Sequence, residues 1–290
     1  MKRICAIVPA LLCVAAFSGA SSGPDEPLAL RVPYLGQKPP GELPQAFAPG
    51  IVTTDHYEFS GVFTPDMKDF YLIRNGGKYE KPTFVVFREQ DGEWLESAIS
   101  PRVGQPFVAP DGKTMHLGRR YMERLEAGWS EPRVLDPPLG SMQIMRLTVS
   151  AQGTYFFDEF VPDFTGSIRY SRLVNGKREE PQLLGRAIDH GKSFHPFIAP
   201  DESYVIFDSK REGGYGDSDL YISYRQPDGA WGEPINLGNR INTAAWEASA
   251  TVTPDGKYLF FNRNMGSDRY ENVDIFWVDA SVIEALRPRQ

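Results

Sequence analysis

Polar residues that could bind or act on a ligand recur along this chain at regular intervals. One series runs Ser60, Gln105, Arg146, His195 and Ser249, with steps of 45, 41, 49 and 54 residues. Glu58 and Glu247 stand two residues before its first and last members. A second series, a little further along each interval, comprises Arg74, Arg119, Asp158, Lys210, Arg211 and Arg263. Guanidinium groups, carboxylates and a histidine around a concave site suit a polar or anionic ligand, and paired carboxylates can also cleave glycosides.

Both series keep step with one repeated turn sequence. It reads Thr64-Pro65-Asp66-Met67-Lys68, Ala109-Pro110-Asp111-Gly112-Lys113, Ala199-Pro200-Asp201-Glu202-Ser203 and Thr253-Pro254-Asp255-Gly256-Lys257, with Ser150-Ala151-Gln152-Gly153 as a degenerate fifth copy. Proline presets φ for the first corner of a turn and Asp-Gly suits the rest, so each copy should link two antiparallel strands. Segments rich in aromatic and branched residues follow at 69–73, 114–117, 154–157, 204–207 and 258–261, and they predict strands.

Two further strands complete each repeat. Third strands are expected at 83–87, 220–224 and 274–278, and a glycine signature, as in Gly128-Trp129 and Gly229-Ala230-Trp231, opens a fourth. The tryptophans of this signature should pack between neighbouring repeats. Four strands in 41 to 54 residues is the length of a propeller blade. We therefore predict an all-β fold, a five-bladed β-propeller of four-stranded antiparallel blades that start near residues 57, 102, 143, 192 and 246. A β-sandwich would not repeat one signature five times, and the coils of a β-solenoid are shorter.

The last repeat lacks its fourth-strand signature, and the chain instead runs through Ser281 to Leu286, where we expect a short helix. When Pro65 is laid over Pro254, residues 41–47 fall on the fourth strand of the preceding repeat. Residues 43–48 should then pair with the last blade and remove an open sheet edge. This places an extended segment at 21–42 and the propeller at 43–286.

The fourth repeat carries a family resemblance. Phe197 to Arg211, followed by Gly213 to Ser223, resembles the PD40 repeat, the WD40-like repeat of TolB-type propellers. The similarity extends over roughly residues 57–280 and is weakest in the third repeat, where Ala151-Gln152 replaces Pro-Asp. The resemblance implies a propeller and leaves the function open, because such propellers serve as periplasmic binding proteins, as sensor modules and as appendages of peptidases.

Propeller geometry predicts where the two polar series lie. The innermost strand of each blade enters at the channel mouth, and the link between the second and third strands returns to that face. The side chains of both series should therefore converge there, and we predict a ligand-binding mouth formed by Glu58, Arg74, Gln105, Arg119, Arg146, Asp158, His195, Lys210, Arg211, Glu247 and Arg263. Only His195 among them titrates near neutrality when unperturbed. The arginines at the ends of the second strands could instead pair with an aspartate of the adjoining blade, and His195 could be a hydrogen-bonded structural residue. Glu58 and Glu247 could cap neighbouring loops.

The first twenty residues predict export. Lys2 and Arg3 precede an apolar stretch, and Ser18-Gly19-Ala20 offers a cleavage site after Ala20, which favours a periplasmic or extracellular protein over a retained membrane anchor. Both cysteines, Cys5 and Cys13, lie in this segment, and Leu12 before Cys13 disfavours a lipoprotein anchor. The mature chain would hold 29 basic and 38 acidic side chains, a charge of −9 that disfavours nucleic acid and anionic lipid.

Metal and cofactor motifs are missing from the sequence. Asp217-Ser218-Asp219 beside three glycines resembles the start of a calcium loop, but a strand follows where the remaining ligands should stand. We therefore expect no metal and no cofactor.

The predicted ligand-binding mouth is compatible with two functions. The first is a monomeric, non-catalytic protein that binds a glycan, a peptide or an envelope protein, and here Arg146→Ala and His195→Ala should abolish binding with little change in melting temperature. The second is a glycoside hydrolase or lyase with Glu58, Asp158 and Glu247 as acid, base or nucleophile. Pairing of both glutamates with arginines would speak against the second.

Overall fold

The computed structural model describes residues 34–161, 166–189 and 192–289. The predicted signal peptide, residues 1–20, and most of the predicted extended segment lie outside the described residues. The described part is nearly all β, with short helices at Tyr34–Gly36 (η1), Leu139–Ser141 (η2) and Ser281–Ala285 (α1). None of these helices is long and apolar enough to cross a membrane.

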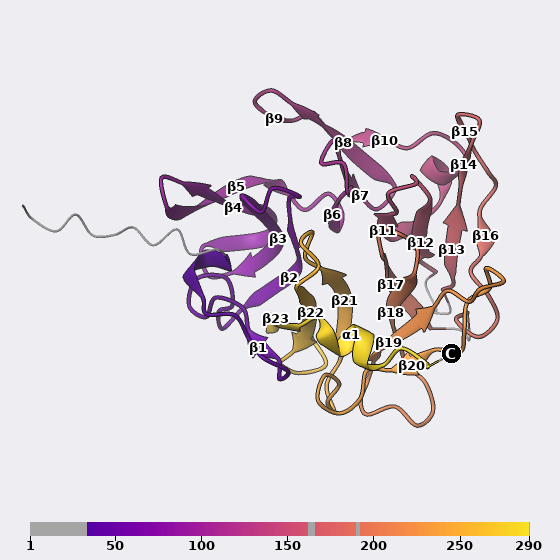
Figure 1. Ribbon diagram of the computed structural model, residues 1–290. Coiled ribbons are helices and arrows are strands. Elements are labelled where there is room, and N and C mark those ends of the chain that lie inside the picture. Colours follow the sequence, from indigo (N-terminus) through magenta and orange to yellow (C-terminus); the bar gives the residue numbers. More distant parts are fainter. Residues whose placement is uncertain (1–33, 162–165, 190–191, 290) are drawn as a thin grey trace, which may run out of the picture. The chain divides into compact units, whose positions relative to one another are not determined.

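The strands form several antiparallel sheets, each built mainly from consecutive segments of the chain (Figure 1). The first sheet holds β2 (Tyr57–Phe63), β3 (Asp69–Gly76), β4 (Tyr79–Gln90) and β5 (Glu93–Pro101). The second holds β6 (Pro106–Val108), β7 (Thr114–Leu117), β8 (Arg120–Leu125), β9 (Gly128–Trp129) and β10 (Arg133–Val134). The third holds β11 (Ile144–Val149), β12 (Tyr155–Glu159), β13 (Ile168–Ser171) and β16 (Gln182–Leu183), beside a hairpin of β14 (Leu173–Val174) and β15 (Lys177–Arg178).

The two remaining groups of strands complete the fold. The fourth sheet holds β17 (Ser193–Ile198), β18 (Tyr204–Ser209), β19 (Asp219–Tyr224) and β20 (Ile235–Asn236). The last strands are β21 (Glu247–Val252), β22 (Tyr258–Asn264) and β23 (Val273–Asp279). From the other end of the chain, β1 (Gln45–Ala46) pairs antiparallel with β23, and β2 meets β23 in parallel through Tyr57 and Val273. The first and last groups of strands are therefore hydrogen-bonded to each other.

The repeated turns fold alike, the degenerate copy included. In each, the amide of the fourth residue donates to the carbonyl of the first, as Gly112 does to Ala109 and Gly153 to Ser150, both at less than 3 Å. Where the turn carries aspartate, its carboxylate accepts the amide two residues on, as Asp111 does from Lys113 at 2.9 Å. The second strands predicted from this turn are confirmed as β3, β7, β12, β18 and β22.

Trp129 and Trp231 of the glycine signature pack against neighbouring sheets. The indole nitrogen of Trp129 donates to the hydroxyl of Tyr71 in the first sheet at 2.9 Å. Trp231 of the fourth sheet meets the ring of Phe156 in the third edge-on, with centroids 6.1 Å apart. These contacts stabilise one sheet against the next through aromatic burial.

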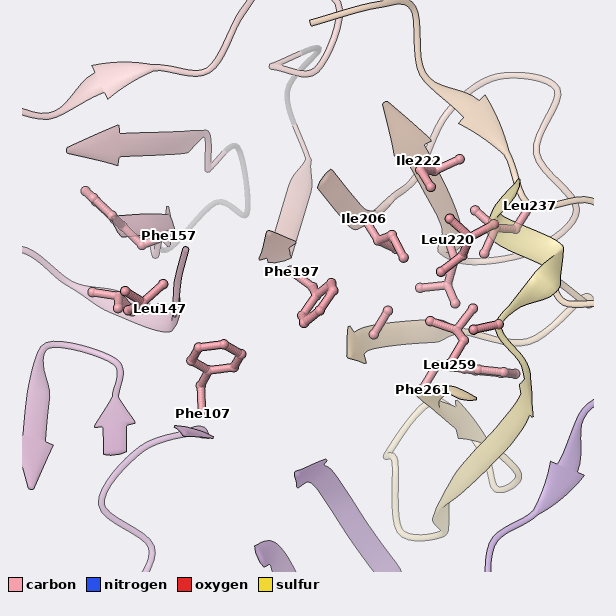
Figure 2. Packing of buried hydrophobic residues seen from close by; sticks show 14 of the residues in the cluster. Phe107, Leu147, Phe157, Phe197, Ile206, Leu220, Ile222, Leu237, Leu259 and Phe261 are labelled. Carbon is pink, nitrogen blue, oxygen red and sulfur yellow. The ribbon is translucent and has the colours of Figure 1, made fainter. Parts of the chain in front are cut away.

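The core runs between sheets as well as within them. Figure 2 shows Phe107 and Phe197 pointing toward each other from the second and fourth sheets, and their ring centroids lie 6.4 Å apart. Leu220, Leu259 and Phe261 belong to the same buried cluster. Alternating apolar residues face this core because successive side chains of a strand point to opposite faces.

The segment that follows β1 is anchored in a second aromatic cluster. Phe47 is fully buried and its ring lies 4.8 Å from that of Phe260 and 5.1 Å from those of Phe70 and Trp277. Its amide donates to the carbonyl of Ile275 at 2.8 Å. Residues close to the N-terminus of the described chain thus pack on strands from both of its ends.

Candidate functional site

Three members of the first polar series occupy strained backbone positions. Ser60, His195 and Ser249 have φ of 60°, 48° and 55°, a region that residues other than glycine rarely adopt, and each stands where the register of its strand pair shifts at a β-bulge. Arg146 lies in the corresponding shift of β11. A bulge re-aims the side chains that follow it, so the same irregularity recurs at each of these polar residues.

A polar side chain holds each bulge, from the same sheet for Arg146 and from a neighbouring group of strands for Ser60, His195 and Ser249. The carboxylate of Asp158 accepts the amides of Arg146 at 2.8 Å and His195 at 2.9 Å. Asp208 accepts the amide of Ser249 at 3.0 Å. Asn262 does the same for Ser60 at 3.0 Å, across 202 positions of sequence. Bonds of this kind satisfy amides that the bulge leaves unpaired in the strand ladder, and they connect successive sheets.

Arg146 hydrogen-bonds to two other members of the first polar series. Its guanidinium donates to the hydroxyls of Ser60 at 3.2 Å and Ser249, and to the carbonyl of Ala250 at 3.0 Å. Ser249 in turn lies 3.3 Å from the side-chain oxygen of Gln105. The structure therefore brings these four residues together, but Arg146 is only 1% exposed. Burial lowers the pKa of Arg146 to about 10, and the charges of Asp158 and Asp208 act in the opposite direction.

His195 is coupled to a second buried carboxylate. Its Nδ1 lies 2.9 and 3.1 Å from the two oxygens of Asp208, which leaves Nε2 as the other polar atom of the ring. Burial alone would lower the pKa of His195, but the charge and hydrogen bond of Asp208, together with the charge of Asp158, raise it above its ordinary value. The imidazole is held in one orientation, and Asp208 favours its protonated form.

His195 also lines a cavity of about 720 Å³. Apart from Met145, the other lining side chains are aromatic, charged or polar: Tyr57, Phe59, Arg102, Gln105, Lys192, Phe194, Asp208, Lys210, Asp217, Ser218, Trp246 and Tyr270. This volume lies within the range of about 300 to 1,000 Å³ found for small-molecule sites. Three predicted mouth residues, Gln105, His195 and Lys210, lie on its surface.

Aromatic side chains form one wall of the cavity. Phe59 and Trp246 are nearly parallel, at 23° with centroids 6.0 Å apart. Tyr57 continues the wall beside Phe59 at 5.7 Å, and Tyr270 meets Trp246 edge-on at 5.4 Å. His195 lies edge-on to both Phe59 and Trp246. A ligand with an apolar ring face could stack on this wall.

Charged and polar side chains on the loops next to β17, β18 and β19 also line the cavity. Lys210 donates to Asp217 at 2.6 Å, and the hydroxyl of Tyr270 reaches the other oxygen of Asp217 at 3.1 Å. The hydrogen bond from Lys210 lowers the pKa of Asp217, and the positive charge of Lys192 contributes to the same shift. The hydroxyl of Ser218 is buried, lines the cavity and has no hydrogen-bond partner among the described residues.

The two glutamates of the predicted mouth are engaged elsewhere. Glu58 accepts the amide and hydroxyl of Thr54 and pairs with Arg74 at 3.2 Å. Glu247 repeats the arrangement with Thr243 and with Arg263 at 2.7 Å. Both glutamates are fully buried and neither lines the cavity. Pairing of both acids with arginines speaks against their use as a glycosidase pair.

The arginines of the second series bind loop carbonyls. Arg74 donates to Ile51 and Val52, Arg211 to Ala187 and Ile188, and Arg263 to Ile241. Arg119 lies in the turn between β7 and β8. None of these four arginines is among the residues that line the cavity. Asp158, fully buried, holds two backbone amides instead of facing the cavity.

Asp274 lies near Glu58, and its surroundings predict that the free energy of unfolding depends on pH. It is buried, and its Oδ1 has no hydrogen-bond partner within the described chain. Burial, with the charges of Glu58 and Asp55, raises the pKa of Asp274 to about 7 from an ordinary value of 3.8. The unfolded chain then holds fewer protons than the native one between these values, so this carboxyl costs stability as pH rises from about 4 to about 7.

We expect Asp274→Asn to raise the free energy of unfolding by about 1–2 kcal/mol at pH 8, with solvent screening allowed for, and to change it little at pH 4. Urea denaturation at both pH values measures the difference. Asp268→Asn, on an exposed loop, is the matched control and should change neither. Equal effects of Asp274→Asn at the two pH values would contradict this account.

Sequence reasoning missed most of the cavity wall. Phe59, Met145 and Phe194 each stand one residue before a member of the first polar series. That recurrence of large apolar residues was the available signal, because a bulge lets consecutive side chains point to one side. Arg102, Lys192 and Trp246 come from loops or strand ends whose positions only the fold sets.

The carboxylates of Asp217 and Asp219, in the segment that resembles the start of a calcium loop, bind groups within the protein. Asp219 is buried and accepts the amides of Tyr215 at 2.7 Å and Gly216 at 3.1 Å, and the amide nitrogen of Asn236 at 2.8 Å. Asp217 is bound by Lys210 and Tyr270 as described. Across residues 34–161, 166–189 and 192–289, no group of three or more His, Cys, Asp or Glu side chains is placed to hold a metal ion.

Comparison with known proteins yields structural likeness only. No protein-family model matches the chain, and no curated protein matches it. Among solved structures, TolB from Acinetobacter baumannii is 12% identical, with a TM-score of 0.47 over 78% of this chain and 57% of its own length. A GH62 hydrolase in complex with xylotriose is 11% identical, with a TM-score of 0.48 over 79% and 95% of the two chains. A gluconolactonase from Xanthomonas campestris is 11% identical, with a TM-score of 0.49 over 82% and 90%.

Proposed function

We propose that this protein is a secreted, monomeric five-bladed propeller of the PD40 type that binds a polar ligand, a glycan, a peptide or a partner protein, in the cavity lined by His195 and Trp246. The pairing of β1 with β23 supports closure of the ring by the N-terminal strand. The bond from Ser60 to Asn262 supports a continuous series of sheets. Export with cleavage after Ala20 is part of the proposal, and the mass of the secreted chain tests it.

One observation carries the binding proposal. The cavity of about 720 Å³ combines an aromatic wall with a histidine that is held in place by a buried aspartate. Apolar walls with a few fixed polar groups are the usual form of a ligand site. The buried network of Arg146, Asp158 and Asp208 beneath it keeps His195 in position, which lowers the entropic cost of binding.

A thermal-shift screen of the mature protein against glycans, peptides and peptidoglycan fragments tests binding. A ligand at about 100 times its Kd should stabilise the native state by about 2.7 kcal/mol. Trp246→Ala should weaken the binding of any hit by at least about tenfold, since a large aromatic anchor contributes roughly 2 kcal/mol or more.

Trp94→Ala is the matched control, because Trp94 lies outside the cavity and packs against a different aromatic cluster. It should leave the affinity unchanged. A hit whose affinity is insensitive to Trp246→Ala binds elsewhere and overturns the assignment of the site.

A further inference from the structure

The charges that line the cavity favour an anion. Its basic side chains are Arg102, Lys192 and Lys210, with His195 beside them, and its acids are Asp208 and Asp217. Asp208 is taken up by His195 and the amide of Ser249, and Asp217 by Lys210 and Tyr270. The remaining basic charge exceeds the remaining acidic charge at the cavity surface. This is the reverse of the whole chain, whose formal net charge is −7.

The neighbouring wall favours a ring with an apolar face. Tyr57, Phe59, Trp246 and Tyr270 form a continuous aromatic surface. The C–H face of a pyranose ring can pack on such a surface while its hydroxyls point to polar groups at the edge. The hydroxyl of Ser218, which has no hydrogen-bond partner among the described residues, and the imidazole of His195 can form hydrogen bonds with these hydroxyls.

From this juxtaposition we infer that the cavity selects an acidic saccharide, with the sugar ring on the Phe59–Trp246 wall and its carboxylate held by Arg102 and Lys192. This inference rests on the proposed binding function and names its ligand class. A cationic cavity on an acidic protein also steers anions toward itself, and charge-assisted bonds to a carboxylate add to the affinity.

The test compares one saccharide with and without its charge. Trigalacturonate and its methyl ester share the same rings and hydroxyls, and calorimetry on the full mature protein measures both. We expect the acid to bind at least about tenfold more tightly than the ester, because one hydrogen bond to a charged group is worth roughly 1.5 kcal/mol or more. The advantage should shrink as salt is raised from 0.05 to 0.5 M, values chosen to span the screening range.

Two variants assign the carboxylate contact. Arg102→Met and Lys192→Met keep the aliphatic stem and remove the charge, and each should weaken trigalacturonate about tenfold and leave the ester unchanged. Lys113→Met is the matched control, an exposed lysine in the turn before β7 and outside the cavity. It should change neither affinity.

The outcomes separate the inference from the proposal beneath it. Equal binding of acid and ester, or loss of ester binding in the charge variants, overturns the acidic class while the cavity remains a ligand site. If a neutral glycan or a peptide from the screen binds and trigalacturonate does not, the acidic class is likewise overturned and the cavity remains a ligand site. Failure of every compound in the screen overturns the proposed function itself.

Discussion

Phe47→Ala is expected to lower the free energy of unfolding by about 3–5 kcal/mol, the usual cost of removing a buried phenylalanine. Phe47 is fully buried, and its ring contacts Phe63, Phe70, Phe260 and Trp277, which come from strands at both ends of the chain. The cavity left by the missing ring would therefore open between the first and last groups of strands. Urea denaturation of the wild type and the variant measures the change.

Leu43→Ala is the matched control from the same segment. Leu43 is 63% exposed, so its truncation should change the free energy by less than about 0.5 kcal/mol. A loss below about 1 kcal/mol for Phe47→Ala would mean that the N-terminal segment is not docked on β22 and β23 in solution.

Arg146→Met is expected to cost about 3–5 kcal/mol, because removing one partner from a buried ionic network leaves its counter-charges uncompensated. The guanidinium supplies hydrogen bonds to Ser60, Ser249 and Ala250 and positive charge close to Asp158 and Asp208. The sequence-based expectation that Arg146→Ala would spare the melting temperature is therefore reversed. That expectation assumed a side chain exposed at the predicted channel mouth, whereas Arg146 is buried.

The pH dependence of the loss identifies its cause. Without Arg146, the positive charge near the buried Asp158 is gone, so keeping that carboxylate ionised in the fold costs more and the variant should lose more stability as pH rises. The deficit of Arg146→Met should be largest at pH 7 and smaller at pH 5. Arg172→Met, at an exposed arginine of the third sheet, should show no such trend. A deficit that is the same at both pH values would point to lost packing alone.

These two predictions bear on the candidate site in different ways. Phe47 stabilises the pairing of the chain's ends, while Arg146 lies under the residues that hold His195. If Arg146→Met also weakens ligand binding, the buried network positions the histidine as well as stabilising the fold. Asp208→Asn offers a milder probe, because it keeps the shape and removes the charge that raises the pKa of His195.

The repeat could be recognised in the sequence because its turns are stabilised by hydrogen bonds between residues that are close in the chain. Turns such as Ala109-Pro110-Asp111-Gly112 fold by bonds within a few residues, so their strands could be placed from the sequence. Strict spacing from these turns also located Ser60, Gln105, Arg146 and Ser249, which meet through hydrogen bonds. The distance from the turn fixes the position of a residue in its strand, and equivalent strands then bring these equivalent residues together.

Only the tertiary structure could tell which of these side chains are buried and which line a cavity. Glu58 and Glu247 look like catalytic carboxylates in sequence, yet both are paired within the protein. Glu58 is bound by Thr54 and Arg74, and Glu247 by Thr243 and Arg263. The β-bulges that re-aim Ser60, His195 and Ser249 have no sequence signature of their own, because the acceptors that stabilise them come from another sheet. Trp246 and Phe59 meet across 187 positions of sequence, and no local pattern records a contact that depends on how whole sheets pack.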